Sequence, residues 1–152
     1  MTPQQAAAGP GLSLAQVIAA VRKVKLPGGS IGVSPGRGLA NLESYFWLTG
    51  AVQPPVDLRV GGSTVHAEFH VVEYAWSFGN GSTLVTSGPG VPGQASEART
   101  VYAARGKYSV TVRVAWSARA SLNGSTVGQV NGLFSVARMT YGVAEIRTVL
   151  TG

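Results

Sequence analysis

The stretch YAWSFGNGS, Tyr74–Ser82, decides the fold, because it joins an alternating aromatic row to a chain reversal. Its aromatic residues Tyr74, Trp76 and Phe78 occupy every second position, and alternate residues of a β-strand face the same side of a sheet. The dipeptide Asn80-Gly81 follows, and Asn-Gly favours a type I′ hairpin turn, whose two central residues need positive φ. The stretch therefore predicts a strand with a buried aromatic face that ends in a turn.

The same alternation extends to both sides of this stretch. In residues 63–71, STVHAEFHV, apolar side chains take every second position, and the phase changes near Val72, which indicates a turn or a bulge. Residues 107–118, KYSVTVRVAWSA, form the most regular strand pattern, and a turn is expected at Asn123-Gly124. With short strands expected at 98–102, 133–139 and 143–150, about seven strands predict an antiparallel sandwich.

The segment before these strands contains the single predicted helix, in SLAQVIAAVRKVKLP, residues 13–27. Ser13 and Gln16 have the spacing of a capping box, and an apolar stripe follows at helical spacing. We expect this helix to pack on the sheet, and a basic amphipathic helix at a membrane surface is the alternative. The predicted organisation is a flexible tail (1–12), a helix and Gly/Pro-rich linker segment packing on the sandwich (13–54), and the sandwich itself (55–152).

Composition narrows the class of protein. The chain has 152 residues, which suits one domain, and charged residues are only 12%. Cysteine is absent, which excludes disulfides and thiol chemistry. The net charge of +6 raises the question of nucleic acid, but the arginines are scattered singly, and the one basic cluster is Arg22, Lys23 and Lys25. This distribution argues against a nucleic-acid partner.

The sequence contains no apolar run near the roughly 20 residues of a membrane span, so we expect no transmembrane segment in this chain. The beginning, MTPQQAAAG, lacks the basic start and apolar segment of a signal peptide. Two alternatives stay open: the chain is cytoplasmic, or a leader has been removed from it.

Beyond a simple hairpin, the pattern resembles the PKD domain, the polycystic-kidney-disease-type immunoglobulin-like sandwich. That family shows W-x-F-G-D-G, then H-x-Y at a strand end, then G-x-Y-x-V-x-V. The positions that match it are Trp76, Phe78, Gly79, Gly81, Tyr102, Gly106, Tyr108, Val110 and Val112. Nearly the whole chain after Gly11 is similar to secreted or membrane-anchored PKD-containing proteins of actinobacteria. The resemblance implies a mainly β, PKD-like antiparallel β-sandwich with one short N-terminal α-helix, placed outside the cell or at its surface.

The chain departs from this family at two places. Aspartates common around the W-x-F-G-D-G turn are replaced by Ser77 and Asn80, so a calcium site there loses its ligands. The cysteine pair common in the actinobacterial proteins is missing, which puts in doubt either secretion or the need for a disulfide.

The candidate metal ligands are His66 and Glu68 in the segment HAEFH, because residues two apart on a strand share a face. His66 and His70 are too far apart for one zinc ion, so a third ligand must come from a neighbouring strand. The alternative is a polar row that faces solvent, and we assign no metal or other cofactor to the chain. Catalytic motifs are also absent from the sequence, so we do not expect an enzyme.

Binding is expected at the consecutive aromatics Tyr45, Phe46 and Trp47, and at Pro89 and Val91 in the loop SGPGVPG. We expect a structural or adhesive interaction domain of the cell surface, whose partner is another protein or a second copy in a self-assembling structure. Two alternatives are a carbohydrate-binding module, since sugars stack on aromatic faces, and a structural component of a phage or pilus.

Overall fold

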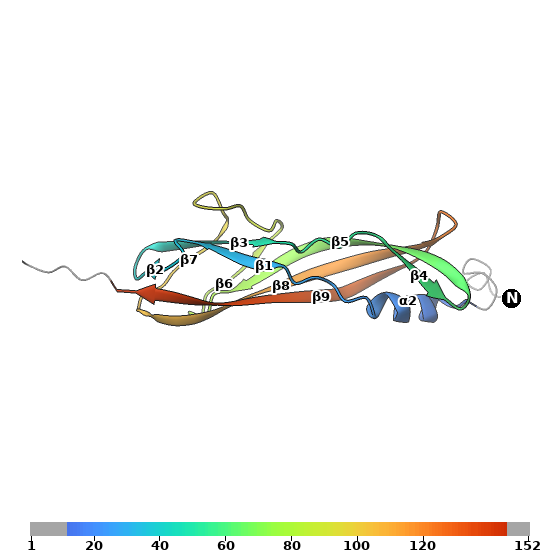
Figure 1. Ribbon diagram of the computed structural model, residues 1–152, viewed down its shortest axis with the longest axis horizontal. Helices are drawn as coiled ribbons and strands as arrows, with labels where there is room; N and C mark the ends of the chain where they lie inside the picture. The colour runs from blue at the N-terminus through green and yellow to red at the C-terminus, as the bar shows by residue number, and fades with distance from the viewer. Residues whose placement is uncertain (1–11, 146–152) are drawn as a thin grey trace, which may run out of the picture. The chain divides into compact units, whose positions relative to one another are not determined.

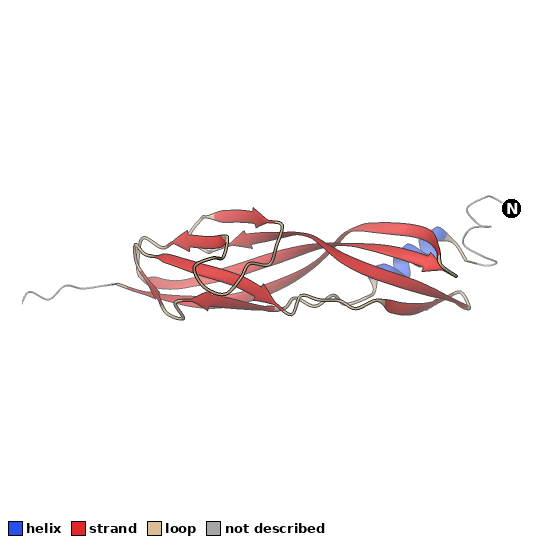
Figure 2. Ribbon diagram, turned by 90° about the horizontal axis from the view of Figure 1, so that it is seen from above, coloured by secondary structure: helices blue, strands red, loops and turns tan. Residues whose placement is uncertain are grey.

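The computed structural model describes residues 12–145. In this part of the chain one helix, α2 (Leu14–Arg22), precedes a series of strands (Figures 1 and 2). The strands are β1 (Ser30–Ser34), β2 (Gly38–Leu39), β3 (Glu43–Thr49), β4 (Val56–Val60), β5 (Ser63–Ser77), β6 (Thr83–Thr86), β7 (Ala98–Val101), β8 (Gly106–Leu122) and β9 (Ser125–Ala144).

The strands form two sheets. One sheet has the order β1-β3-β7, and both of its pairings are antiparallel. The other has the order β2-β9-β8-β5-β4, with β6 paired to β5. The pairing of β2 with β9 is parallel. The predicted fold class, a mainly β PKD-like sandwich with one N-terminal helix, is confirmed.

The described residues divide into two compact units, which we describe separately. The first unit contains α2 and β4, with residues 12–27, 52–72 and 115–135. The second unit contains β1, β2, β3, β6 and β7, with residues 28–51, 73–114 and 136–145. Strands β5, β8 and β9 contribute residues to both units.

An aromatic cluster forms the core of the second unit and joins its two sheets. The ring of Phe46, on β3, lies 5.2 Å from that of Phe78 and 5.4 Å from that of Tyr141 on β9. Trp76 lies 6.4 Å from Phe46 and is 1% exposed. The buried Tyr102 hydroxyl donates to the carbonyl oxygen of Phe78 at 2.8 Å. The predicted inward face of YAWSF is therefore confirmed.

The helix of the first unit begins as the sequence predicts. Ser13 and Gln16 form both hydrogen bonds of the capping box, and Val17 and Val21 are buried. The helix ends earlier than Pro27, because Lys23 is already its C-cap residue. Of the basic cluster Arg22, Lys23 and Lys25, only Arg22 therefore lies in the last turn of the helix.

Strand lengths differ from the expectation of short strands, since β5, β8 and β9 have 15, 17 and 20 residues. The segments expected near 133–139 and 143–150 begin within one strand, β9, and residues 146–150 lie outside the described residues. Gly132 has φ of 76° inside β9, and the buried positions change phase there, between Val130 and Leu133. In the sequence, this change of phase in the buried positions looks like a break between two strands.

Of the two alternatives predicted near Val72, the turn is wrong, because β5 is continuous there. The buried positions of β5 change phase between Phe69 and Tyr74, which agrees with the other alternative, a bulge. The Gly/Pro-rich segment that follows the helix, expected to be a linker within residues 13–54, contains β1, which pairs with β3 from Ser30↔Thr49 to Ser34↔Tyr45. Its Gly and Ser content hid the strand from sequence patterns, since strand propensity favours β-branched and aromatic residues.

The two Asn-Gly turns differ in conformation. Asn123 and Gly124 have φ of 51° and 82°, the signs that a type I′ turn requires. At the other turn, positive φ occurs at Gly79 and Gly81 and not at Asn80, so the type I′ expectation for Asn80-Gly81 is wrong. The Asn80 side chain instead accepts a hydrogen bond from the Ser82 amide at 3.0 Å, as in an Asx turn.

Candidate functional site

The outward side of strand β3 carries two of the expected binding residues. Ser44, Phe46 and Leu48 are buried, so Tyr45 and Trp47 face the other side of the sheet. In the register of the sheet, Trp47 lies opposite Gly32 and Tyr45 lies between Ser34 and Arg99. We call the surface formed by Gly32, Ser34, Tyr45, Trp47 and Arg99 the aromatic face.

The indole of Trp47 lies over Gly32 on β1. A Cβ atom placed on Gly32 would lie 2.3 Å from the indole atoms Cε2 and Nε1, so only glycine leaves room for this position of the ring. Trp47 remains partly exposed. The ring is thus held in place by the sheet while one part of it faces outward.

Tyr45 is fixed by two charged neighbours. Its hydroxyl donates to Glu43 Oε2 at 2.7 Å, and the guanidinium of Arg99 lies 5.7 Å from its ring centroid. Arg99 Nη1 is also 3.6 Å from Glu43 Oε2. The hydrogen bond to Glu43 raises the pKa of the Tyr45 hydroxyl above its usual value. The charged neighbours orient the ring, which lowers the entropy lost when a partner binds.

The loop SGPGVPG lies beside β3, next to the part of β3 that does not pair with β7. The Leu48 amide donates to the carbonyl oxygen of Pro89 at 2.9 Å, and Ser96 Oγ donates to the carbonyl oxygen of Phe46. Pro89 is exposed, and Val91 is 48% exposed. The structure therefore anchors the expected loop residues to the strand that carries Tyr45 and Trp47.

Phe46, the remaining expected binding residue, lies elsewhere. Its side chain is 0% exposed and belongs to the aromatic core of the second unit. The alternation of a strand explains this, because three consecutive residues cannot face the same side.

His66 and Glu68 lie close together in the first unit, with a second acid, Asp57, beside them. His66 Nδ1 is 2.9 Å from Asp57 Oδ1, and its Nε2 is 3.6 Å from Glu68 Oε1. Asp57 lies directly opposite His66 in the pairing of β4 with β5. The hydrogen bond to Asp57 is the main cause that raises the pKa of His66, and it outweighs the opposing effect of desolvation.

Glu68 has a second partner, because Arg119 Nη2 lies 2.8 Å from its Oε2 atom. That guanidinium lowers the pKa of Glu68. The two ring nitrogens of His66 face different carboxylates, which suits a chain of ion pairs. Across residues 12–145, no group of three or more His, Cys, Asp or Glu residues is arranged to hold a metal ion.

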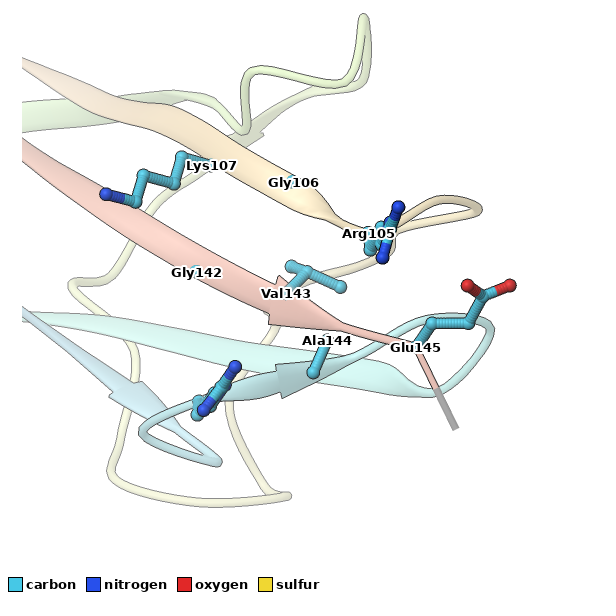
Figure 3. Close-up of a pocket in the computed structure, with 8 residues that line it drawn as sticks. Arg105, Gly106, Lys107, Gly142, Val143, Ala144 and Glu145 are labelled. Atoms are coloured by element: carbon cyan, nitrogen blue, oxygen red, sulfur yellow. The ribbon is translucent and has the colours of Figure 1, made fainter. Parts of the chain in front are cut away.

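The structure also forms a basic hollow that the sequence does not reveal, of about 520 Å³ in the second unit. Figure 3 shows Arg105 to Lys107 at the beginning of one strand and Gly142 to Glu145 at the end of another. These strands, β8 and β9, are neighbours in the sheet, and Arg37 completes the lining. In the sequence Arg37 lies far from Arg105 and Lys107, so only the strand pairing could show that they line one hollow.

Within the described residues, no helix is long and apolar enough to cross a membrane.

Comparison with known proteins gives a family for the chain. No curated protein matches it. The family model of the PKD domain matches residues 44–128, more than half of the chain. PKD domains are in general extracellular immunoglobulin-like domains with adhesive or structural roles, and their fold is non-enzymatic. The chain belongs to the PKD domain family.

Proposed function

We propose that this chain is a non-enzymatic adhesive domain, displayed outside the cell or at its surface, that binds a protein partner through the aromatic face. The partner that we propose first is a second copy of the chain, in a self-assembling surface structure. Membership of the PKD domain family supports the location. An assembly in a phage or pilus would use the same surface.

The observation that carries this proposal is the fixed, partly exposed pair Tyr45 and Trp47. Aromatic residues are enriched at the centres of protein interfaces, and a ring that is already immobile loses little entropy on binding. Gly32 and Ser34 beside them are small, so the rings are the prominent side chains of the aromatic face. Arg99 adds a cation, which together with aromatic residues is common among interface hot spots.

Light scattering over a concentration series tests the proposal. We expect the wild-type chain to form a discrete oligomer as concentration rises, and Trp47→Ala to weaken it at least tenfold, a typical hot-spot loss. Val85→Ala is the matched control, since Val85 is an exposed apolar residue on β6, outside the aromatic face. A wild-type monomer at every concentration would exclude self-assembly, and an equal loss with Val85→Ala would exclude the aromatic face as the interface.

A carbohydrate ligand is the second candidate, because Tyr45 and Trp47 share one face at two-residue spacing. That spacing corresponds to about 6–7 Å along a strand, a distance over which sugar rings can stack on aromatic side chains. Retention on an insoluble polysaccharide, lost in Trp47→Ala and kept in Val85→Ala, would favour this function. If the chain passes through several such matrices without delay while light scattering shows an oligomer, the carbohydrate function fails and the protein interface stands.

A further inference from the structure

The basic hollow gathers three cations from two separate segments of the chain. Parallel pairing of β2 with β9 aligns Gly38 with Val143, which places Arg37 beside the end of β9. Arg105 and Lys107 come from the beginning of β8, on the other side of β9. Among the described residues that line the hollow, the one acid is Glu145.

These three cations differ in their partners from two arginines that lie outside the hollow, Arg99 and Arg119. Arg99 and Arg119 lie within 4 Å of Glu43 and Glu68 respectively. By contrast, Arg37, Arg105 and Lys107 form no ion pair with any residue in the range 12–145. Like charges that line one hollow repel one another, and a bound anion removes that repulsion.

Open space lies in front of Gly142, one of the residues that line the hollow. A Cβ atom placed on Gly142 would have no neighbour within 4 Å, so the space in front of it is empty. The φ angle of Gly142 is outside the left-handed range, and its backbone therefore accepts a side chain. A volume of about 520 Å³ is within the usual range for small-molecule sites and larger than a single phosphate needs.

We propose that the basic hollow binds an oxyanion group, a phosphate or a carboxylate, carried by a ligand of about the size of a monosaccharide. The guanidinium groups of Arg37 and Arg105 are donors with the fork geometry that matches either anion, and Lys107 adds a compact charge. No residue of the aromatic face lines this hollow, so the site is independent of the function proposed above.

Titration of the ¹⁵N-labelled chain, followed by amide chemical shifts at low salt, tests this site. The probes are glucose 6-phosphate, glucuronate and glucose, which share a sugar ring and differ in charge. We expect one or both charged probes to shift the amides of residues 105–107 and 142–145, with weaker binding at physiological salt because the ions screen the charges. The tighter charged probe identifies the oxyanion. No shift with either charged probe, or equal shifts with glucose, would overturn the proposal.

Substitutions then distinguish binding of the anion in the basic hollow from non-specific attraction of the anion by the net positive charge of the chain. Arg37→Ala and Arg105→Ala should each weaken binding about tenfold, the loss expected for a charge-assisted hydrogen bond. Arg138→Ala removes the same charge from an exposed position on β9 outside the hollow, and it should leave affinity unchanged. Gly142→Leu should abolish binding without any change of charge. If Arg138→Ala weakens binding as much as Arg37→Ala does, the anion is attracted by net charge only, and the proposed site is wrong.

Discussion

Glycine at position 32 determines where the indole of Trp47 lies. In Gly32→Val the new Cβ would occupy the place of the indole, so we expect the ring to move out into solvent. Stability should change by less than about 1 kcal/mol, because valine also favours a strand. Acrylamide quenching of tryptophan fluorescence measures the movement, since Trp76 and Trp116 are buried and contribute little to it.

Ser34→Val is the control for this measurement. Ser34 lies on β1 like Gly32, but it is opposite Tyr45 and not Trp47. The Ser34→Val variant should leave tryptophan quenching at the wild-type level. If quenching in Gly32→Val equals the wild-type value, the position of the Trp47 indole does not depend on Gly32.

His66 makes stability depend on pH in a defined direction. Its folded-state pKa is raised above the ordinary 6.5, mainly by the hydrogen bond to Asp57. The stabilisation is therefore complete below pH 6.5 and is lost as pH rises through the raised value. NMR titration of the His66 ring from about pH 5 to pH 9 measures the shift. Asp57→Asn should lower the pKa towards 6.5, and a wild-type value at or below 6.5 would contradict the geometry.

At the scale of one strand, β3 places neighbouring aromatics in opposite environments. Phe46→Ala should cost about 3–5 kcal/mol, because it empties a site between Phe78, Trp76 and Tyr141. Trp47→Ala should cost only about 1 kcal/mol, since the indole is partly exposed. Urea unfolding measures both variants. Similar losses for the two would mean that β3 does not alternate between core and surface.

On the scale of the whole molecule, buried tyrosines limit stability at high pH. Burial raises the pKa of Tyr74, Tyr102 and Tyr141 above the ordinary value of 10.0. Their contribution is complete below pH 10.0 and is lost as pH rises through the raised values, because the unfolded chain ionises first. We expect the urea midpoint to fall above about pH 10 and tyrosinate absorbance to rise together with unfolding.

Tyr102→Phe is the control for this loss, because it removes one of the ionisable groups and keeps the ring. The variant should be less stable at neutral pH by about 1 kcal/mol, for the lost hydrogen bond to Phe78. Its stability should then fall less steeply above pH 10. Tyrosinate absorbance that rises well before the chain unfolds would show that these hydroxyls are accessible to water.

The sequence alone determined the inward rows of β5 and β8, the capping box at Ser13 and the turn at Asn123-Gly124. Each of these depends on side-chain periodicity or on the conformational preference of two to four neighbouring residues. The same periodicity implies that Tyr45 and Trp47 share a face opposite to that of Phe46, as the structure places them.

Only the tertiary structure decided which distant segments meet. Strand β1 has few residues with strand propensity, so its local sequence pattern indicates a linker. Its pairing with β3 is what makes it a strand. Arg37 and Arg105 are 68 positions apart, and they line one hollow because β2 and β8 lie on either side of β9. Strand pairing joins residues regardless of their separation in the chain, and no local pattern carries that information.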